Sequence, residues 1–212
     1  MQYVKSLEDI TQKIERIFLE KSPYTWIHSL NVSRIAMIIA ENFDLNEENL
    51  EAVRIGGLLH DVGKIYIPSG ILNKPSKLTE EEFLIIKEHP ILGVREFEGI
   101  IFSPDIIKIL HILLYHHERY DGNGYPYRLK GEDIPFLTRI VSVADVIDAI
   151  CGSRPYKEGL PIEAVIKELE GAKWLQLDPH IVEVALSNID KIIEGYNTKT
   201  PLNSDVLISS VG

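Results

Sequence analysis

Seven residues of the types that bind metal ions lie between positions 28 and 145 of this chain: His28, His60, Asp61, His89, His116, His117 and Asp145. Imidazole nitrogens and carboxylate oxygens together suit iron, manganese, zinc or nickel. A carboxylate can bridge two ions while the residue beside it binds one of them. Two ions about 3.5–4 Å apart can activate a water and hold the attacking and leaving oxygens of a phosphoryl group. The set therefore indicates a centre of two divalent metal ions with hydrolytic chemistry.

Each of these residues, taken singly, also has an ordinary structural interpretation. A lone histidine such as His28 or His89 is more often a satisfied core residue than a ligand. The adjacent pair His116–His117 could simply end a helix, where histidine suits the helix dipole. Asp145 follows apolar residues, and a buried carboxylate needs a partner, of which a metal ion is one. The combination favours the metal site, because five of the chain's seven histidines belong to the set.

The elements that must position this set are helices, since apolar residues recur at helical spacing and no regular strand alternation is present. Thr79–Glu82 forms a capping box, and Asp178–Pro179 is a second start signal. The Gly- and Pro-containing stretches 62–78 and 118–134 are expected to be irregular loops beside the site. We expect an all-α fold with helices over 16–20 (reaching back to Ser6), 24–43, 47–61, 79–88, 90–97, 104–117, 135–150, 161–170 and 179–194.

Composition narrows the functional classes. The chain has 212 residues, 45% of them hydrophobic, and a net charge of −10. An acidic chain of this kind argues against a nucleic-acid polymer as partner, because such surfaces need clustered Lys and Arg. No uninterrupted apolar run reaches the ~18 residues of a spanning helix, so membrane insertion is not expected. With a single cysteine, Cys151, no internal disulfide can form, and a cytoplasmic location fits.

Two motifs carry a family resemblance. Residues 58–64, LLHDVGK, resemble the HD signature of metal-dependent phosphohydrolases, and residues 116–126, HHERYDGNGYP, resemble the signature of the HD-GYP subgroup. Shorter matches occur in the same order, and the likeness runs from about 24 to 190: ILNKP at 71–75, HP at 89–90, LKG at 129–131, VAD at 143–145 and RPY at 154–156.

The resemblance implies an all-α HD-domain helical bundle with a buried bimetal centre. It places the HD-GYP domain at 24–195, after a helical lead-in at 1–23. Residues 196–212 are polar and have no helical stripe, so we expect a loose tail there. The resemblance also implies the ligand sets. One ion would be held by His28, His60, Asp61 and Asp145, and the other by Asp61, His89, His116 and His117.

The resemblance further implies the residues that meet the substrate. Lys64, three residues after Asp61, would contact the scissile phosphate, and these two residues would be the catalytic ones. Tyr125, Arg154 and Lys157 would bind the rest of the ligand. Read without the family, Arg154 and Lys157 are ordinary solvated residues and Tyr125 packs a turn.

Two positions and one short stretch depart from the family pattern. Tyr24 stands where some members carry a carboxylate for a third ion, which favours two ions here. Arg128 stands where glycine is common, and residues 149–153 differ from the usual run.

Glu118, beside the ligands, is expected to orient a ligating histidine.

The predicted function is a metal-dependent phosphodiesterase of bacterial signalling. It would hydrolyse cyclic di-GMP or a related cyclic dinucleotide to the linear dinucleotide, with two divalent ions per chain. Whether a second cleavage to mononucleotide follows stays open. Iron or manganese is favoured, and other transition metals stay open. Two partners stay open: a signalling protein and a second copy of the chain. The alternatives are an HD phosphohydrolase that acts on another nucleotide and a catalytically silent cyclic-dinucleotide receptor.

Overall fold

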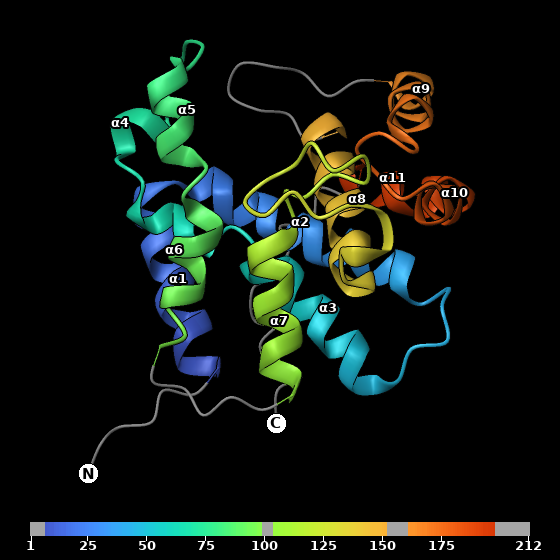
Figure 1. Ribbon diagram of the computed structural model, residues 1–212, viewed down its shortest axis with the longest axis horizontal. Coiled ribbons are helices and arrows are strands. Elements are labelled where there is room, and N and C mark those ends of the chain that lie inside the picture. The colour runs from blue at the N-terminus through green and yellow to red at the C-terminus, as the bar shows by residue number, and fades with distance from the viewer. Residues whose placement is uncertain (1–6, 99–103, 152–160, 198–212) are drawn as a thin grey trace.

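The computed structural model describes residues 7–98, 104–151 and 161–197. Within these ranges the chain is a bundle of helices without a β-sheet (Figure 1). The α-helices are α1 Leu7–Lys21, α2 Pro23–Ala40, α3 Glu47–Leu59, α4 Ser69–Leu72, α5 Glu80–Ile86, α6 His89–Arg95, α7 Pro104–Tyr115, α8 Phe136–Cys151, α9 Ile162–Ala172, α10 Pro179–Ser187 and α11 Ile189–Asn197. Two 3-10 helices are η1 Val62–Tyr66 and η2 Gly131–Asp133. The predicted all-α class is confirmed.

Two expectations about the elements are wrong. The single helix expected over 179–194 is broken at Asn188, whose φ of −112° leaves the helical region. The Asn188 side chain donates to the carbonyl of Val184 at 2.9 Å and so ends α10. The stretch 62–78, expected to be irregular, contains η1 and α4. These turns are too short for a helical stripe of apolar residues to reveal them.

The predicted start signals are confirmed. The Thr79 hydroxyl accepts from the backbone N–H of Glu82 at 3.2 Å, and the Glu82 carboxylate accepts from the N–H of Thr79 at 2.7 Å. The Asp178 carboxylate accepts from the N–H groups of His180 and Ile181 at the start of α10. Each contact satisfies N–H groups that have no partner within the helix.

Helix α2 is the central element. It contacts α1, α3, α8, α10 and α11, and a helix that is apolar on most sides is expected to be surrounded in this way. One core cluster joins α2 to α8 and α9–α11 through residues such as Ile35, Ile140 and Val182. The other joins α1, α2, α3 and α7 through Phe18, Leu59 and others. Helices α2, α3, α7 and α8, which carry or directly precede most of the predicted metal ligands, contribute residues to these clusters.

Two further features bear on the predicted organisation. Ile10, Ile14 and Phe18 of α1 are buried in the second cluster, so the described part of the predicted lead-in packs into the core. The domain boundaries themselves stay predictions. Among the described residues no helix combines the length and apolarity needed to cross a bilayer.

Candidate metal centre

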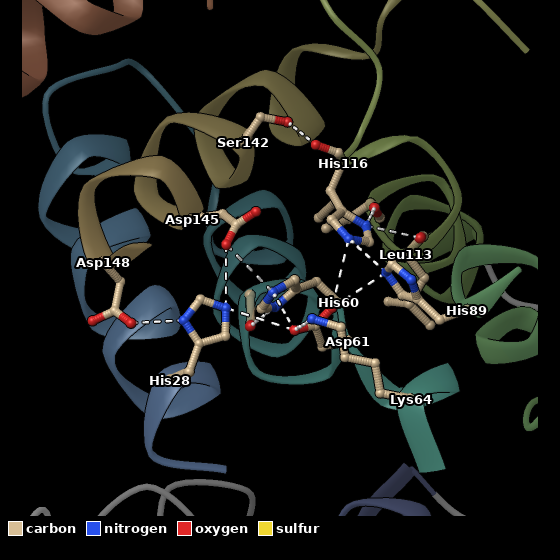
Figure 2. Close-up of polar contacts among 12 residues, drawn as sticks. His28, His60, Asp61, Lys64, His89, Leu113, His116, Ser142, Asp145 and Asp148 are labelled. Carbon is tan, nitrogen blue, oxygen red and sulfur yellow. Dashed lines mark hydrogen bonds and ion pairs between the residues drawn. The ribbon is translucent and has the colours of Figure 1, made fainter. Parts of the chain in front are cut away.

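The seven predicted ligands converge from five places in the sequence. Figure 2 shows His28, His60, Asp61, His89, His116 and Asp145. His28 comes from α2, His89 begins α6 and Asp145 lies on α8. His60 and Asp61 directly follow α3, while His116 and His117 directly follow α7. Helix ends therefore deliver both adjacent pairs to the same point, although about 55 residues of sequence separate them.

The ligand atoms form two overlapping groups. In one, single atoms of Asp61, His89, His116 and His117 all lie within 4.8 Å of one another. In the other, His28, His60 and Asp61 meet the same limit. Asp145 borders the second group, with Oδ1 3.2 Å from Nε2 of His28 and 3.9 Å from Nε2 of His60. Asp61 belongs to both groups, the arrangement that a bridging carboxylate requires.

Hydrogen bonds at Nδ1 fix the orientation of four imidazoles. Carbonyl oxygens of Gly57, Ile86 and Leu113 lie 2.8, 2.7 and 2.9 Å from Nδ1 of His60, His89 and His116, respectively. The Asp148 carboxylate lies 2.6 Å from Nδ1 of His28. A carbonyl oxygen can only accept, so Nδ1 carries the proton and Nε2 is left to face the cluster. Metal-binding histidines are held by such bonds.

Several inward-facing atoms need a cation. Nε2 of His89 and Nε2 of His116 lie 3.3 Å apart, and with Nδ1 protonated both present a lone pair. Oδ1 of Asp61 lies 3.3 Å from the same His89 nitrogen. Within the described residues, Nε2 of His60 and Oδ1 of Asp61 are buried without a hydrogen-bond partner. Buried polar atoms left unpaired are costly, and divalent ions bound at the two overlapping groups would satisfy them.

Protonation states agree with ligation at one group. Burial lowers the pKa of His89, His116 and His117, in the last case to about 3. These imidazoles are therefore neutral at physiological pH, as a metal ligand must be. Burial alone would raise the pKa of Asp61, but Lys64 and His60 hold it well below its usual range, so this carboxylate is ionised.

His28 differs from the other histidines. Burial alone would lower its pKa, but hydrogen bonds with Asp145 and Asp148 and the negative charge around it raise the pKa to about 10. The pKa of Asp145 is lowered against the effect of burial, through its hydrogen bond with His28. In the metal-free protein an imidazolium thus occupies the place of a cation between two carboxylates. A metal ion bound there would displace its Nε2 proton.

Two glycines of the motifs are needed for close backbone contacts. A Cβ atom at Gly63 would lie 1.8 Å from the carbonyl oxygen of His89, so η1 can approach α6 only with glycine there. A Cβ atom at Gly124 would lie 2.4 Å from the backbone nitrogen of Arg119. The 118–134 loop therefore folds back directly onto the segment that carries His116 and His117.

The expected role of Glu118 is wrong. Its buried carboxylate accepts from the backbone N–H of Tyr127 at 2.6 Å and of Leu129 at 3.1 Å. Both oxygens thus hold the loop rather than an imidazole. The residue that does orient a ligand candidate is Asp148, which sequence reasoning missed. The sequence feature that could have revealed it is its spacing from Asp145, because residues three apart lie on the same face of a helix such as α8.

Two cavities flank the cluster, and both are bordered by His117, Asp145 and Gln176. The larger, of about 630 Å³, is also lined by Lys64, Tyr24 and residues of the α4–α5 region that include Lys74 and Lys77. The smaller, of about 280 Å³, is also lined by Tyr125 and Lys87. Lysines on both sides suit an anionic ligand.

The predicted substrate residues are distributed between these cavities. Lys64 lies in the larger one, with Nζ 2.6 Å from Oδ2 of Asp61. Tyr125 lies in the smaller one, where its ring stacks on His117 at 4.8 Å between centroids. Arg154 and Lys157 fall outside the described residues. Lys74, Lys77 and Lys87 were not predicted as site residues. Lys74 lies in the ILNKP match, but that match assigned it no role, and lysines are common in a charged chain.

A family model described as an HD domain matches residues 7–181. This chain belongs to the HD-domain family. The prediction made from the LLHDVGK and HHERYDGNGYP motifs is confirmed. The buried His/Asp cluster of this HD domain is compatible with a divalent metal site.

Curated relatives of the HD-domain chain are named as phosphodiesterases. The cyclic di-GMP phosphodiesterase response regulator RpfG of Xanthomonas campestris is 43% identical over 170 residues, which cover 79% of this chain and 45% of RpfG. A cyclic di-GMP phosphodiesterase of Thermotoga maritima is 36% identical, covering 92% of this chain and 54% of the relative. The 3′3′-cGAMP-specific phosphodiesterase 3 of Vibrio cholerae is 32% identical, covering 94% and 42%. The chain spans about half the length of these relatives.

Solved structures share the fold at lower identity. A Bdellovibrio bacteriovorus protein described as an HDG"Y"P protein has a TM-score of 0.64 at 18% identity, covering 87% of this chain and 65% of that one. The HD domain of the Listeria monocytogenes phosphodiesterase PgpH, in complex with cyclic di-AMP, has a TM-score of 0.54 at 20% identity, covering 93% and 94%. These likenesses confirm the predicted HD-domain fold.

Proposed function

We propose that this HD domain is a metal-dependent phosphodiesterase that hydrolyses a 3′,5′-phosphodiester of cyclic di-GMP or a related cyclic dinucleotide. The linear dinucleotide is the first product, and a second cleavage to mononucleotide stays open. The substrate class rests on the relatives, several of which are named for cyclic di-GMP or 3′3′-cGAMP. Hydrolytic chemistry rests on the His/Asp cluster.

The observation that carries the proposal is the facing pair of imidazole nitrogens. Nε2 of His89 and Nε2 of His116 lie 3.3 Å apart, with unpaired Oδ1 of Asp61 beside them. A purely structural cluster would pair these atoms with hydrogen-bond donors. A cluster that awaits a cation leaves its lone pairs facing inward, as here.

The seven His and Asp residues of the cluster would hold two metal ions. His28, His60, Asp61 and Asp145 are proposed for one ion and Asp61, His89, His116 and His117 for the other, with iron or manganese favoured. When bound, such a pair supplies a hydroxide at neutral pH and charge stabilisation for the phosphoryl oxygens. Asp61, present in both sets, would fix the spacing of the ions.

The chain's own residues would place and stabilise the phosphate. Lys64 projects into the larger cavity while its ammonium stays 2.6 Å from Asp61. A phosphate oxygen that approaches the cluster through this cavity therefore meets a fixed positive charge. Such preorganised charge acts where negative charge develops in the transition state. Tyr125 would contact the ligand from the smaller cavity, and Arg154 and Lys157 are proposed to bind its flanks.

The decisive experiment is product analysis after anaerobic reconstitution with Fe(II) or Mn(II). The reconstituted chain is incubated with cyclic di-GMP, 3′3′-cGAMP and cyclic di-AMP, and products are separated by chromatography. We expect the linear dinucleotide to appear first. Metal content should approach two ions per chain. Asp61→Ala, prepared in parallel, is the matched control that shows that turnover belongs to this cluster.

The outcomes separate the alternatives. Cleavage of nucleotide monophosphates but not of cyclic dinucleotides would identify an HD phosphohydrolase with another substrate. Tight binding of a cyclic dinucleotide without turnover, with both ions present, would identify a silent receptor. One ion per chain at saturation would overturn the two-ion assignment. The cytoplasmic location, the bacterial origin and a signalling-protein or homodimer partner stay predictions from the sequence.

A further inference from the structure

We propose that Tyr196, on the C-terminal helix α11, is a positioning residue for His28 and acts on it through Asp148. The inference rests on the proposed metal site, because His28 matters to catalysis only as a ligand. It assigns to α11 a part in the metal centre. Tyr196 lies beyond residues 7–181, the stretch that the HD-domain model matches, so the family pattern does not contain it.

The contacts form a chain of two short hydrogen bonds. The Tyr196 hydroxyl donates to Oδ1 of Asp148 at 2.5 Å. The other oxygen, Oδ2, accepts from Nδ1 of His28 at 2.6 Å (Figure 2). Asp148 is 1% exposed, so water has little access to either oxygen. Both oxygens are therefore committed, one to α11 and one to the ligand candidate.

The Asp148 carboxylate is restricted in orientation because its two oxygens have different partners. A buried carboxylate held at one oxygen alone can rotate about its Cβ–Cγ bond, and its unpaired oxygen would carry a desolvation cost. With Tyr196 in place, the plane of the Asp148 carboxylate is set from both sides. The His28 ring then has one favoured orientation, with Nε2 3.2 Å from Asp145 and 3.6 Å from Asp61.

Helix α11 is itself fixed against α2, the helix that carries His28. The guanidinium of Arg34 lies over the Tyr196 ring at 5.4 Å from the centroid and donates to the carbonyl of Ile192 at 3.1 Å. Gly195 leaves room for this approach, since a Cβ atom there would lie 2.1 Å from a terminal guanidinium nitrogen of Arg34. Ile192 is fully buried in the core. Tyr196 is thus presented to Asp148 by a docked helix.

The first test is Tyr196→Phe, which removes the hydroxyl and keeps the ring above Arg34. Metal dissociation constants are measured by competition with a chromophoric chelator, and thermal unfolding is measured on the metal-free protein. Outer partners of metal ligands typically change affinity 10- to 100-fold, so a residue one contact further away should weaken one metal equivalent about three- to tenfold. The unfolding midpoint should fall by only about 2–4 °C, the cost of leaving one buried oxygen of Asp148 unpaired.

Tyr66→Phe is the matched control. Tyr66 also donates to a carboxylate, that of Glu96, which pairs with Lys13 rather than with the His/Asp cluster. Its loss should leave both metal dissociation constants unchanged. A control that weakens metal binding as much as Tyr196→Phe would show a general effect of losing a tyrosine hydroxyl, and would overturn the inference.

The second test asks whether Tyr196 acts through Asp148. In an Asp148→Asn background, Tyr196→Phe should cause less than a twofold further loss of metal affinity, since the acceptor has already changed. Independent, multiplying losses would overturn the proposed route. Unchanged metal binding by Tyr196→Phe alone would also overturn it. So would a fall in the stability of the metal-free protein large enough to account for the whole loss of metal affinity. Failure of the wild-type chain to bind any divalent ion would instead overturn the proposed function, and this inference with it.

Discussion

Nζ of Lys64 lies 2.6 Å from Oδ2 of Asp61. The cation proposed to meet the scissile phosphate is therefore anchored on the carboxylate proposed to bridge the two ions. Its side chain is 21% exposed, on the side of the larger cavity. This contact links substrate approach to the metal cluster.

Lys64→Ala should lower kcat by about 100-fold or more with a modest change in KM, because its charge is worth most where negative charge develops in the transition state. Steady-state kinetics on cyclic di-GMP with the reconstituted enzyme would measure this. Lys191→Ala is the control, since Lys191 pairs with Glu41 on the surface. A rise in KM alone would place Lys64 among uniform binding contacts instead.

Asp61→Ala should cost more metal and more activity than Asp145→Ala, because Asp61 belongs to both ligand groups. Elemental analysis after loading, alongside circular dichroism, would check this. The circular dichroism signal of the helices should survive, because the two hydrophobic core clusters contain none of the His/Asp ligands. A grossly unfolded Asp61→Ala variant would give the metal a structural role, and normal metal content with normal turnover would remove Asp61 from the centre.

Arg154→Ala and Lys157→Ala should mainly raise KM and leave metal content unchanged. Contacts to the flanks of the ligand are made equally in the ground and transition states. Their kinetics, compared with those of Lys64→Ala, separate binding from chemistry. Normal binding and turnover by Arg154→Ala would show that this part of the sequence is ordinary solvated surface.

The metal-free protein should be most stable near pH 6.5. An unfolded histidine titrates near pH 6.5, and the pKa of His28 is about 10 in the fold, so its stabilising effect is complete below pH 6.5 and lost as the pH rises toward 10. The pKa of His117 is about 3, so stability also declines as the pH falls from 6.5 toward 3. Thermal unfolding in a strong chelator would trace this curve.

His28→Gln tests which group produces the alkaline decline. This variant should flatten the curve above pH 6.5 and leave the acid decline in place. If the alkaline decline persists unchanged in His28→Gln, another group must cause it. Wild-type stability that is constant between pH 6.5 and 10 would show that His28 does not hold the extra proton.

Arg128→Gly should stabilise the fold by about 1 kcal/mol. Arg128 is exposed and has a φ of 58°, in the left-handed region, where a side chain costs energy and glycine does not. Chemical denaturation would measure the gain. Lys130→Gly is the matched control, because Lys130 is extended at a φ of −128° and glycine there should destabilise. Equal effects in the two variants would contradict this explanation.

Much of the site could be predicted from the sequence because its ligands are chemically distinctive. His60 and Asp61 stand side by side within a recognisable motif, and helical spacing showed that they end a helix. The helix caps at Thr79 and Asp178 could be predicted for a similar reason, since capping depends on residues a few positions apart.

What escaped prediction depends on contacts between distant elements or on local competition. Tyr196 meets Asp148 only because α11 docks on α2, and no local pattern encodes that approach. Glu118 is adjacent to the ligands in sequence, yet the backbone of its own loop takes both oxygens. Asn188 breaks a continuous apolar stripe because its side chain bonds to Val184, a competition that periodicity alone does not reveal.

The hydrogen bonds that orient His89 and His116 have a consequence for how such a protein can diverge. Their acceptors are main-chain oxygens of Ile86 and Leu113, which remain whatever side chain those residues carry. The cavity walls, in contrast, are largely side chains such as Lys74 and Lys87. Substitutions can therefore alter which ligand fits without disturbing the imidazoles. Natural selection can thus act on ligand preference and on the reactive centre independently.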